Sequence, residues 1–563
     1  MLFEEALKQV GDFGLFQYML IVYLCVFVAP LRVLPLFTHI FSLLEPPHWC
    51  RNPYLEHFNL TQEEIQNVSI LRATGGSWSK CEMYEYNWSL WEPSMPMPAF
   101  NSSSPVIPCP YGWKYDHSVI YPTIVSDMDW VCGQSWKTYV SNSLFFGSMS
   151  VGVILFGAIS DKVGRAPVMI VVYIAAGAGG LLTYFSYSFP VFLVTRAIQG
   201  LVLLSISIIP FVLAIEYVPA QKRMLVLTAF RFAYPLLGCC MPWVAYAIGD
   251  WRLLNAIVVV PCIVAPAVSW FIPESSRWLI SKGKTKATKK IMTRIAKMNG
   301  KQVDPDVFDS LEFQGKDGKV KKSSSWEIFK MPSLRRNFLI TLFLWLMSCL
   351  TYSAGQLYAA TATDSPFVMS SSTNGVDILA TAIALPLADK WGRRPSMVTS
   401  YIVAAVSYIA VGFLPTGERL AAFVVLMIGR FALTTAYNVG YLYAAEIYPT
   451  AIRSQALSIR QAFGSMGKFL SSQVVQLAFY SQYLPLFILG GMSFLSSIIT
   501  YPLPETNNQK LPETLEDGEN MKYWPKSFCP CITKDEMHRR GSEVRGRSMS
   551  TMSAATVDSV SPH

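Results

Sequence analysis

Two pairs of opposite charges recur at almost one offset in this chain of 563 residues. Asp161 and Arg165 stand four positions apart, and Asp389 and Arg393 repeat them 228 residues later. A carboxylate and a guanidinium four apart on a helix lie on one face and form an ion pair. We therefore expect these residues to form ion pairs that are made in one conformation of the protein and broken in another.

A second repeat sits one segment further along each half. Glu216 and Arg223 are matched by Glu446 and Arg453 at an offset of 230 residues. A third pair of motifs, Pro-Glu at 273–274 and at 504–505, follows at an offset of 231 residues. Three motifs at nearly one offset indicate an internal duplication.

Two more arginines follow the same duplication, because Arg196 and Arg430 hold matching places in the two halves. We expect the charged residues of the first two repeats, together with Arg196 and Arg430, to act in gating, closing the inner face when the protein faces out and releasing it when it faces in. Topological anchoring is the alternative; it accounts for Arg393 and Arg394 equally well, but leaves the matched acidic residues unexplained.

The elements that position these residues are membrane-spanning helices. The chain is 52% hydrophobic and 15% charged, and its apolar runs of about 20 residues are long enough to cross a bilayer. The runs are continuous, which excludes an alternating β-barrel pattern. We predict an all-α membrane protein whose twelve spans lie near 16–41, 139–159, 167–187, 190–216, 224–249, 253–273, 337–360, 370–388, 396–414, 419–446, 454–479 and 484–503.

The distribution of basic residues predicts the orientation. The stretch between spans six and seven is rich in Lys and Arg, which stay cytosolic in short loops. The expected order is therefore a cytosolic N-terminus at 1–15, a six-helix bundle at 16–273, a cytosolic loop at 274–336, a second bundle at 337–504 and a disordered cytosolic tail at 505–563. The net charge of +9 then reflects topology. No nucleic-acid motif is visible, and we expect a lipid membrane and a small solute as partners of a functional monomer.

The predicted outside loop, at 42–137, carries two kinds of covalent modification signal. Its sequons place expected glycans at Asn59, Asn67, Asn87 and Asn101. Its cysteines form an even set, for which we expect two disulfides with the connectivity left open: Cys50, Cys81, Cys109 and Cys132. None of the eleven cysteines has the spacing of a metal site. No catalytic His or Cys constellation and no phosphate loop occurs, so neither an enzyme nor a cofactor is expected.

Several motifs carry a resemblance to a known family. They are Gln9-Val-Gly11-Asp-Phe-Gly14-Leu-Phe16-Gln17, Cys109-Pro-Tyr-Gly112-Trp113, Asp129-Trp130-Val131-Cys132, Asp250-Trp251-Arg252, Pro273-Glu274-Ser-Ser-Arg277-Trp278-Leu279 and Glu446-Ile-Tyr448-Pro449-Thr450-Ala-Ile-Arg453. Together with the repeated aspartate-to-arginine loops, residues 3 to 516 resemble the organic cation, anion and zwitterion transporters of solute carrier family 22, in the major facilitator superfamily. The resemblance implies two pseudo-symmetric six-helix bundles and transport by alternating access in the plasma membrane.

Ionisable residues within the predicted spans mark the expected substrate site, because such residues are costly in lipid. They are Arg32, Arg231, Asp377, Arg460 and Lys468. Asp377 precedes Asp389 by twelve residues, or about 18 Å of helix, which places it near the membrane centre. The resemblance supports a cavity role for Asp377; a structural partner for a neighbouring arginine is the alternative.

The charge rules of the family do not transfer directly. In the cation transporters an aspartate, and in the anion transporters an arginine, stands where this chain has Ser465, and the anion transporters' lysine of span eight corresponds to Thr381. Lys468 lies one turn beyond Ser465 on the same face. Aromatic residues matching the family's cavity pattern are Trp345, Tyr352 and Phe211.

The basic residues outnumber the single acidic one, even if Arg231 and Arg460 reach the interface. The sequence therefore predicts a polyspecific transporter of small organic ions that favours zwitterions or organic anions. An organic cation transporter is the alternative within transport. A non-transporting receptor on the same fold is the alternative from another class.

Overall fold

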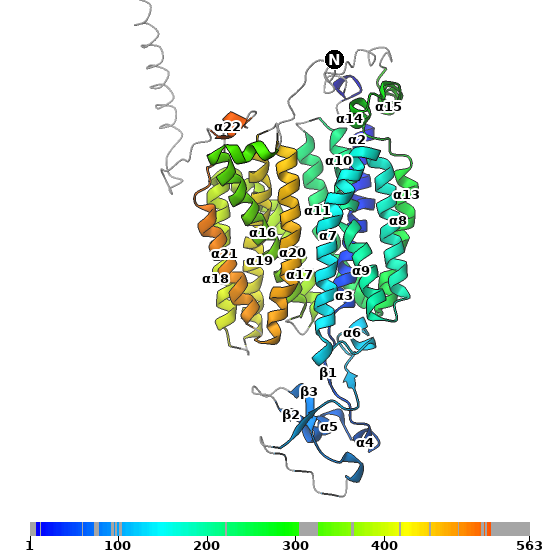
Figure 1. The fold of residues 1–563 in the computed structure, drawn as a ribbon, viewed down its shortest axis with the longest axis vertical. Coiled ribbons are helices and arrows are strands. Elements are labelled where there is room, and N and C mark those ends of the chain that lie inside the picture. Colours follow the sequence, from blue (N-terminus) through cyan, green and yellow to red (C-terminus); the bar gives the residue numbers. More distant parts are fainter. Residues whose placement is uncertain are drawn as a thin grey trace, which may run out of the picture.

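The computed structural model describes residues 7–519 except 12, 59, 73–77, 92–94, 96–97, 99, 101–103, 220–221, 303–324, 362–364, 416–417, 450–451, 482, 508–511 and 513–514. The sequons at Asn59 and Asn101 and the tail beyond residue 519 lie outside these residues. The helices form two bundles side by side, with a small domain of strands and short helices projecting from one end (Figure 1).

The first bundle is built from six spans, three of which are interrupted. A π turn (η1) breaks the first span, and breaks after Leu203 and Ile257 divide two others. The elements are α2 (Leu15–Tyr23), η1 (Leu24–Val28), α3 (Ala29–Ser42), α7 (Trp136–Val163), α8 (Arg165–Tyr184), α9 (Phe189–Leu203), α10 (Ser205–Glu216), α11 (Arg223–Ile248), α12 (Trp251–Ile257) and α13 (Val259–Ser269).

The second bundle repeats this arrangement with longer helices. They are α16 (Pro332–Thr361), α17 (Pro366–Trp391), α18 (Arg393–Phe413), α19 (Arg419–Ile447), α20 (Arg453–Gln476), continued by η7 (Leu477–Phe479), and α21 (Leu484–Thr500). In the described part of the chain, nine helical segments are long and apolar enough to cross a membrane. α17 and α20 are long but more polar, and α21 has 17 residues; with these three the fold agrees with the twelve predicted spans.

Both bundles turn apolar side chains outward. Large exposed side chains such as Ile154, Trp270, Phe413 and Leu420 belong to the spanning segments. Burying them in lipid is favourable, whereas the polar side chains described below lie inside. The outer surface is therefore the lipid-facing surface of a membrane protein.

The projecting domain fills the loop predicted at 42–137. It contains β1 (His48–Cys50) paired antiparallel with β5 (Trp113–Tyr115), and the three-stranded order β2 (Ile70–Arg72), β3 (Trp78–Tyr84), β4 (Val106–Pro108). Its short helices are α4 (Pro53–Glu56), α5 (Gln62–Ser69), η2 (Trp88–Leu90), α6 (Ile124–Asp127) and η3 (Cys132–Gln134). We call the end of the bundles that carries this domain the disulfide end.

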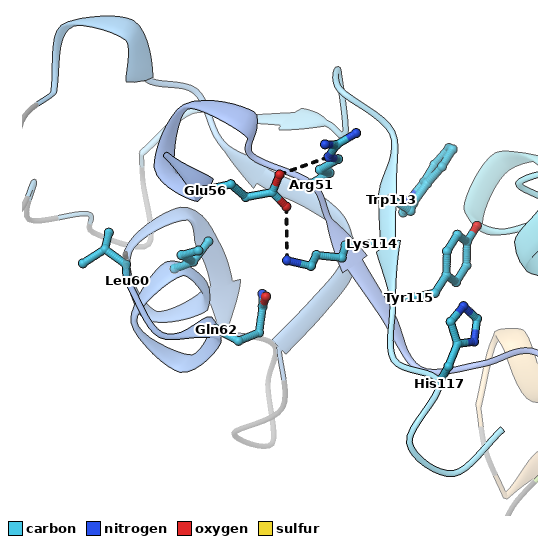
Figure 2. Close-up of a pocket in the computed structure, with 9 residues that line it drawn as sticks. Arg51, Glu56, Leu60, Gln62, Trp113, Lys114, Tyr115 and His117 are labelled. Carbon is cyan, nitrogen blue, oxygen red and sulfur yellow. Dashed lines mark hydrogen bonds and ion pairs between the residues drawn. The ribbon is translucent and has the colours of Figure 1, made fainter. Parts of the chain in front are cut away.

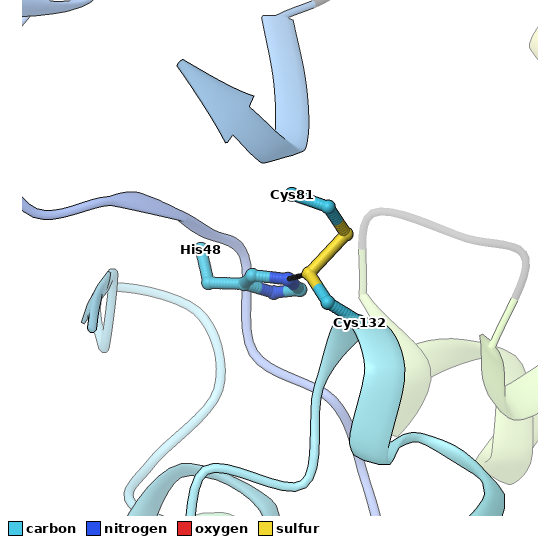
Figure 3. A group of neighbouring side chains, drawn as sticks. All are labelled: His48, Cys81 and Cys132. Atoms are coloured by element: carbon cyan, nitrogen blue, oxygen red, sulfur yellow. Dashed lines mark hydrogen bonds between the residues drawn. A yellow bond between two sulfur atoms is a disulfide. The ribbon is translucent and has the colours of Figure 1, made fainter. Parts of the chain in front are cut away.

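Two disulfides hold the projecting domain, as predicted, and the structure selects the connectivity Cys50–Cys109 and Cys81–Cys132. His48 Nε2 lies 3.9 Å from the sulfur of Cys132, so the three side chains form a compact group (Figure 3). Thiolates are the metal ligands of cysteine, and both sulfurs here are used in the disulfide. The group is therefore part of the disulfide framework of the projecting domain.

The opposite end carries the repeated charged motifs, and we call it the motif end. The link between the bundles begins there with α14 (Ser276–Ser281) and α15 (Thr285–Met298) and ends with η6 (Ser325–Lys330). Asn299, just after α15, accepts a hydrogen bond from the Phe16 backbone N–H at 3.0 Å and donates to the Gln17 side chain at 3.2 Å. The start of the link is thereby tied to the N-terminal helix.

Part of the tail predicted to be disordered is ordered. α22 (Leu515–Glu519) packs at the motif end of the second bundle, where the Glu519 carboxylate accepts hydrogen bonds from the backbone N–H groups of Ser333 and Leu334, each at 2.9 Å. The carboxylate caps the first turn of α16, which is a favourable position for a negative charge.

The two bundles meet through α7 against α20 and α11 against α17. Ser143 and Ser472 hydroxyls are 3.0 Å apart, and the Ser371 hydroxyl donates to the Cys239 carbonyl at 2.8 Å. Ser143 and Ser371 lie in the first third of α7 and α17, the part nearest the disulfide end. In this conformation the halves are thus joined near that end.

Candidate functional site

The first charge network lies at the motif end of the first bundle. Arg165 Nη2 lies 3.1 Å from Asp161 Oδ1 and 3.6 Å from Glu216 Oε1. The Ser275 hydroxyl donates to the same Glu216 carboxylate. The guanidinium therefore connects the end of α7, the start of α8 and the end of α10.

The second bundle repeats this network with shorter contacts. Arg393 Nη1 lies 2.8 Å from Asp389 Oδ1 and Nη2 lies 3.2 Å from Glu446 Oε1. The Thr506 hydroxyl donates to Glu446 at 2.6 Å, in the position of Ser275 in the first bundle. Asn507 accepts a further hydrogen bond from Arg393 at 2.8 Å.

Each network connects helices within its own bundle, so these predicted gating contacts do not cross between the bundles. Arg223 and Arg453 also hold matching places, since each donates through Nε to the carbonyl five residues earlier, Val218 at 3.2 Å and Tyr448 at 3.0 Å. Arg196 and Arg430 were grouped with the gating residues, but the structure places both near the middle of their helices. They belong to separate polar clusters.

Glu274 and Glu505, the acidic residues of the repeated Pro-Glu motif, each contact the start of a neighbouring helix. Glu274 accepts hydrogen bonds from the backbone N–H groups of Arg165 and Ala166 at 2.9 and 3.1 Å. Glu505 does the same for Arg393 and Arg394 at 2.8 and 3.0 Å. Each carboxylate caps a helix N-terminus, where backbone N–H groups have no helical partner. The repeated Pro-Glu motif was the signal that could have found them.

Glycine is required where each cap meets its helix. Gly164 and Gly392 have φ of 122° and 98°, with ψ of 162° and 158°. This region of backbone space is almost restricted to glycine. A Cβ on Gly392 would also lie 3.0 Å from a Glu505 oxygen, and one on Gly164 would meet Glu274.

Gly164→Ala is therefore expected to lower the free energy of unfolding by about 1–3 kcal/mol, the cost of a non-glycine residue in this region. Thermal unfolding of the purified protein in detergent measures the effect. Gly157→Ala is the matched control, because that glycine lies in α7 with no atom near the added Cβ. Equal unfolding midpoints for the two variants would contradict the assigned strain.

Asp377 lies in a buried cluster with Arg430. The guanidinium binds the carboxylate at two points, Nε to Oδ1 at 2.9 Å and Nη2 to Oδ2 at 2.7 Å. The hydroxyls of Tyr352 and Thr434 donate to the same carboxylate at 2.8 and 2.6 Å. Both charged side chains are 3% exposed. In this conformation Asp377 is the partner of an arginine, the alternative left open by the sequence.

A hydrogen-bond chain leads from this cluster toward the first bundle. The Thr381 hydroxyl donates to the Asp377 carbonyl at 2.7 Å and accepts from the Asn438 amide at 3.2 Å. Asn438 in turn accepts from Arg231 Nη1 at 3.3 Å, which crosses between the bundles. Thr381 and Arg231, both predicted site residues, are thus connected.

Four basic side chains, the central cations Arg32, Arg231, Arg460 and Lys468, come from both bundles. Arg32 is close enough to interact electrostatically with Arg231 and with Lys468. Within the described part of the chain, none of the four lies within ion-pair distance of a carboxylate. The three arginines lie over aromatic faces: the guanidinium carbon of Arg460 lies 3.8 Å from the Trp345 ring centroid, that of Arg231 lies 4.2 Å from Tyr441, and that of Arg32 lies 5.0 Å from Tyr234.

The predicted aromatic face is a stacked column. Tyr437 lies between Trp345 and Tyr352, with ring centroids 4.6 and 5.1 Å away. Phe211 stacks instead on Phe230 within the first bundle at 5.8 Å. Ser465 is buried and its hydroxyl donates to the Gln461 carbonyl at 3.1 Å, within its own helix. The column and the central cations together form the candidate site.

A separate hollow of about 610 Å³ lies in the projecting domain (Figure 2). The Glu56 carboxylate pairs with Arg51 and Lys114 there, each at 3.2 Å. Burial raises the pKa of Glu56, but the two cations outweigh this effect and hold it below its usual value. This hollow is distinct from the central cations, since it belongs to the loop domain.

Of the predicted glycan sites, Asn67 and Asn87 are described. The Asn67 amide donates to the Glu63 carbonyl at 2.8 Å within α5. The Asn87 side chain is exposed and accepts a hydrogen bond from Ser89 of its own sequon at 2.6 Å. Both asparagines are exposed, and glycosylation at both stays a prediction.

Comparisons with known proteins agree with this geometry. The family model for "Sugar (and other) transporter" matches residues 80–517. The chain is 29% identical over 534 residues to solute carrier family 22 member 6 of Rattus norvegicus, covering 92% of this chain and 94% of the relative. It is 28% identical to the beta-alanine transporter of Drosophila melanogaster and 28% identical to organic cation transporter 1 of Caenorhabditis elegans, each covering 96% of this chain and 92% of the relative.

Solved structures show the same fold. A partially occluded inward-open conformation of the xylose transporter XylE from E. coli matches with a TM-score of 0.53 and 19% identity, covering 67% of this chain and 90% of that one. A complex of the same proton:xylose symporter, of the major facilitator superfamily, matches with a TM-score of 0.51, covering 69% and 89%. The chain therefore belongs to the sugar (and other) transporter family within the major facilitator superfamily, a family of transporters and not of enzymes, and its predicted resemblance to solute carrier family 22 is confirmed.

Proposed function

We propose that this transporter carries small organic anions, in particular solutes with a carboxylate, by alternating access between its two bundles. One observation carries the proposal: the carboxylate of Asp377 is occupied, while Arg32, Arg231, Arg460 and Lys468 lack a carboxylate partner in the described part of the chain. A substrate carboxylate would supply the negative charge that these cations lack.

The energetics favour an anion over a cation. Arg430 and two hydroxyl donors already satisfy Asp377, so an incoming amine has to break a buried, bidentate ion pair. An incoming carboxylate instead gains charge-assisted hydrogen bonds of about 1.5–3 kcal/mol each. The stacked column of Trp345, Tyr437 and Tyr352 accepts a flat or apolar substrate body.

A zwitterion is the second candidate substrate. The printed names of the relatives include an organic anion transporter, an organic cation transporter and a beta-alanine transporter. An ammonium group on such a substrate would bind an aromatic face, where a cation gains about 0.5–2 kcal/mol, and its carboxylate would still meet the central cations. The two candidates therefore share one anion-binding subsite.

The proposed location is the plasma membrane, with both termini in the cytosol and a monomer as the working unit. Disulfides persist in oxidising compartments, which favours an extracellular disulfide end. Basic residues gather in the link that leaves the motif end, as the positive-inside tendency requires of a cytosolic face.

Uptake into proteoliposomes tests the proposal. We expect saturable uptake of labelled benzoate, weaker uptake of β-alanine and little of tetraethylammonium. Lys468→Gln and Arg460→Gln should each raise the KM for benzoate about tenfold or more, because each removes a charge-assisted contact worth at least about 1.4 kcal/mol. Lys390→Gln is the matched control: it removes one positive charge from an exposed position at the motif end of α17.

Three outcomes separate the alternatives. Uptake of tetraethylammonium that exceeds uptake of benzoate would contradict the anion proposal and favour a cation carrier. Equal KM changes for all three solutes in Lys468→Gln would mean that this residue holds the helices together. Binding without uptake of any solute would favour a receptor on a transporter fold.

A further inference from the structure

Arg196 is a buried cation without a counter-charge. It is 0% exposed in α9 of the first bundle, and no described carboxylate lies within ion-pair distance. Its Nη1 donates to the Gln199 side-chain oxygen and its Nη2 to that of Asn255, both at 2.8 Å. Its guanidinium carbon lies 4.5 Å from the Phe192 ring centroid. Neutral oxygens and a ring face solvate the charge without neutralising it.

In the second bundle the corresponding arginine has a carboxylate partner. Arg430, the counterpart of Arg196, is neutralised by Asp377. Asp377 stands twelve residues before Asp389, and the residue twelve before Asp161 is Met149. Met149 is buried in α7, the helix that packs against α9. The duplication therefore kept the arginine in both halves and the aspartate in one.

The surroundings of Arg196 hold further polar atoms that lack partners. Arg196 Nε, the Gln199 amide nitrogen and both ring nitrogens of His39 are buried without a hydrogen-bond partner. His39 lies close enough for the Arg196 charge to act on its ring, which stacks on Phe145 with centroids 4.0 Å apart. The Asn142 side-chain oxygen, an acceptor beside His39, is also unpartnered and can take one ring N–H.

Arg196 Nε and the Gln199 amide nitrogen are donors, whereas a neutral His39 ring has one donor and one acceptor nitrogen. An unmet buried donor costs about 1–3 kcal/mol. Water can accept hydrogen bonds from them, but it leaves the charge of Arg196 uncompensated in a low-dielectric interior. A small anion does both. It accepts hydrogen bonds from Arg196 Nε and from the Gln199 amide nitrogen, and it supplies the negative charge that Asp377 supplies in the other bundle.

We propose that Arg196 and Gln199 form a site for a small inorganic anion, with chloride as the physiological occupant. The site lies inside the first bundle, on α9, and is distinct from the central cations between the bundles. The site goes beyond the proposed function, because it concerns a resident ion of one bundle and holds whatever solute the transporter carries.

Equilibrium binding of radiolabelled chloride to the purified full-length protein tests the site directly. We expect saturable binding of one chloride per chain in sodium gluconate buffer at constant ionic strength. The thermal unfolding midpoint should rise by several degrees and saturate over the same range of chloride concentration, since a ligand that binds the folded state stabilises it. Absence of saturable binding to the wild-type protein would overturn the proposal without relying on any variant.

Met149→Asp is the decisive variant, because it restores the carboxylate that the second bundle has. Chloride binding and the chloride-dependent midpoint shift should both disappear, and the midpoint in gluconate should approach that of the wild type in chloride. Met149→Asn, of nearly equal size and without charge, is the matched control and should still bind chloride. Arg460→Gln should also keep the bound chloride. Loss of binding in Arg460→Gln with retention in Met149→Asp would place the anion among the central cations and refute the assignment.

Discussion

Asp377→Asn is expected to lower the free energy of unfolding by about 3–5 kcal/mol, the usual cost of removing one partner from a buried ion pair. The reason is the guanidinium of Arg430, which keeps its charge but loses its counter-charge and one of the two oxygens that accept its hydrogen bonds. Thermal or denaturant unfolding in detergent, together with the fraction of protein that reaches the membrane, measures the loss.

Two matched variants sharpen this test. Asp389→Asn removes a carboxylate that is 66% exposed, so its cost should be at most about 1 kcal/mol. The double variant Asp377→Leu with Arg430→Met removes both charges and should recover most of the stability, because a buried pair replaced by apolar residues is often neutral. A stable Asp377→Asn protein that discriminates poorly between amines and carboxylates would show instead that Asp377 binds substrate.

Arg393→Ala should reduce the transport rate at least about tenfold while the protein still reaches the membrane. This arginine contacts Asp389, Glu446 and Asn507 at once, and a single charge-assisted hydrogen bond is worth about 1.5–3 kcal/mol, or tenfold and more in rate. Removing it frees the end of α17 from the end of α19. Initial uptake rates, divided by the amount of protein in the membrane, give the measurement.

Arg394→Ala is the matched control for this prediction. It removes the same charge from the next position, where the guanidinium carbon lies 4.7 Å from the Tyr501 ring centroid, toward α21. We expect its uptake rate to fall less than that of Arg393→Ala, because a cation–π contact is worth about 0.5–2 kcal/mol. Equal losses in the two variants would indicate that the arginines act only as topological anchors.

The two bundles differ most where the duplication has lost a charge. The motif-end networks and the helix caps by Glu274 and Glu505 are repeated almost contact for contact. The buried arginine clusters are not repeated, because the first half has Met149 at the position that corresponds to Asp377. The charge networks are thus alike in the two bundles, whereas the buried arginines have different partners in each.

The sequence by itself determined the membrane-spanning architecture, the duplication and the number of disulfides. These features depend on local patterns, namely apolar runs of fixed length, motifs at a constant offset and an even set of cysteines in one loop. The same patterns placed Asp377 and Lys468 within spans. They also gave correct segment positions for the predicted charge networks, with Asp161 and Arg165 in contact as expected.

Tertiary structure alone decided which side chains meet. Helical spacing defines the face on which Asp377 lies, but the rotation and tilt of α17 against α19 bring Arg430 and not a substrate to it. The same holds for Arg196, which turns to Asn255 on α12, and for the pairing Cys50–Cys109. Contacts between residues far apart in the chain depend on how preformed helices and strands pack, and a single sequence carries no local pattern that records this packing.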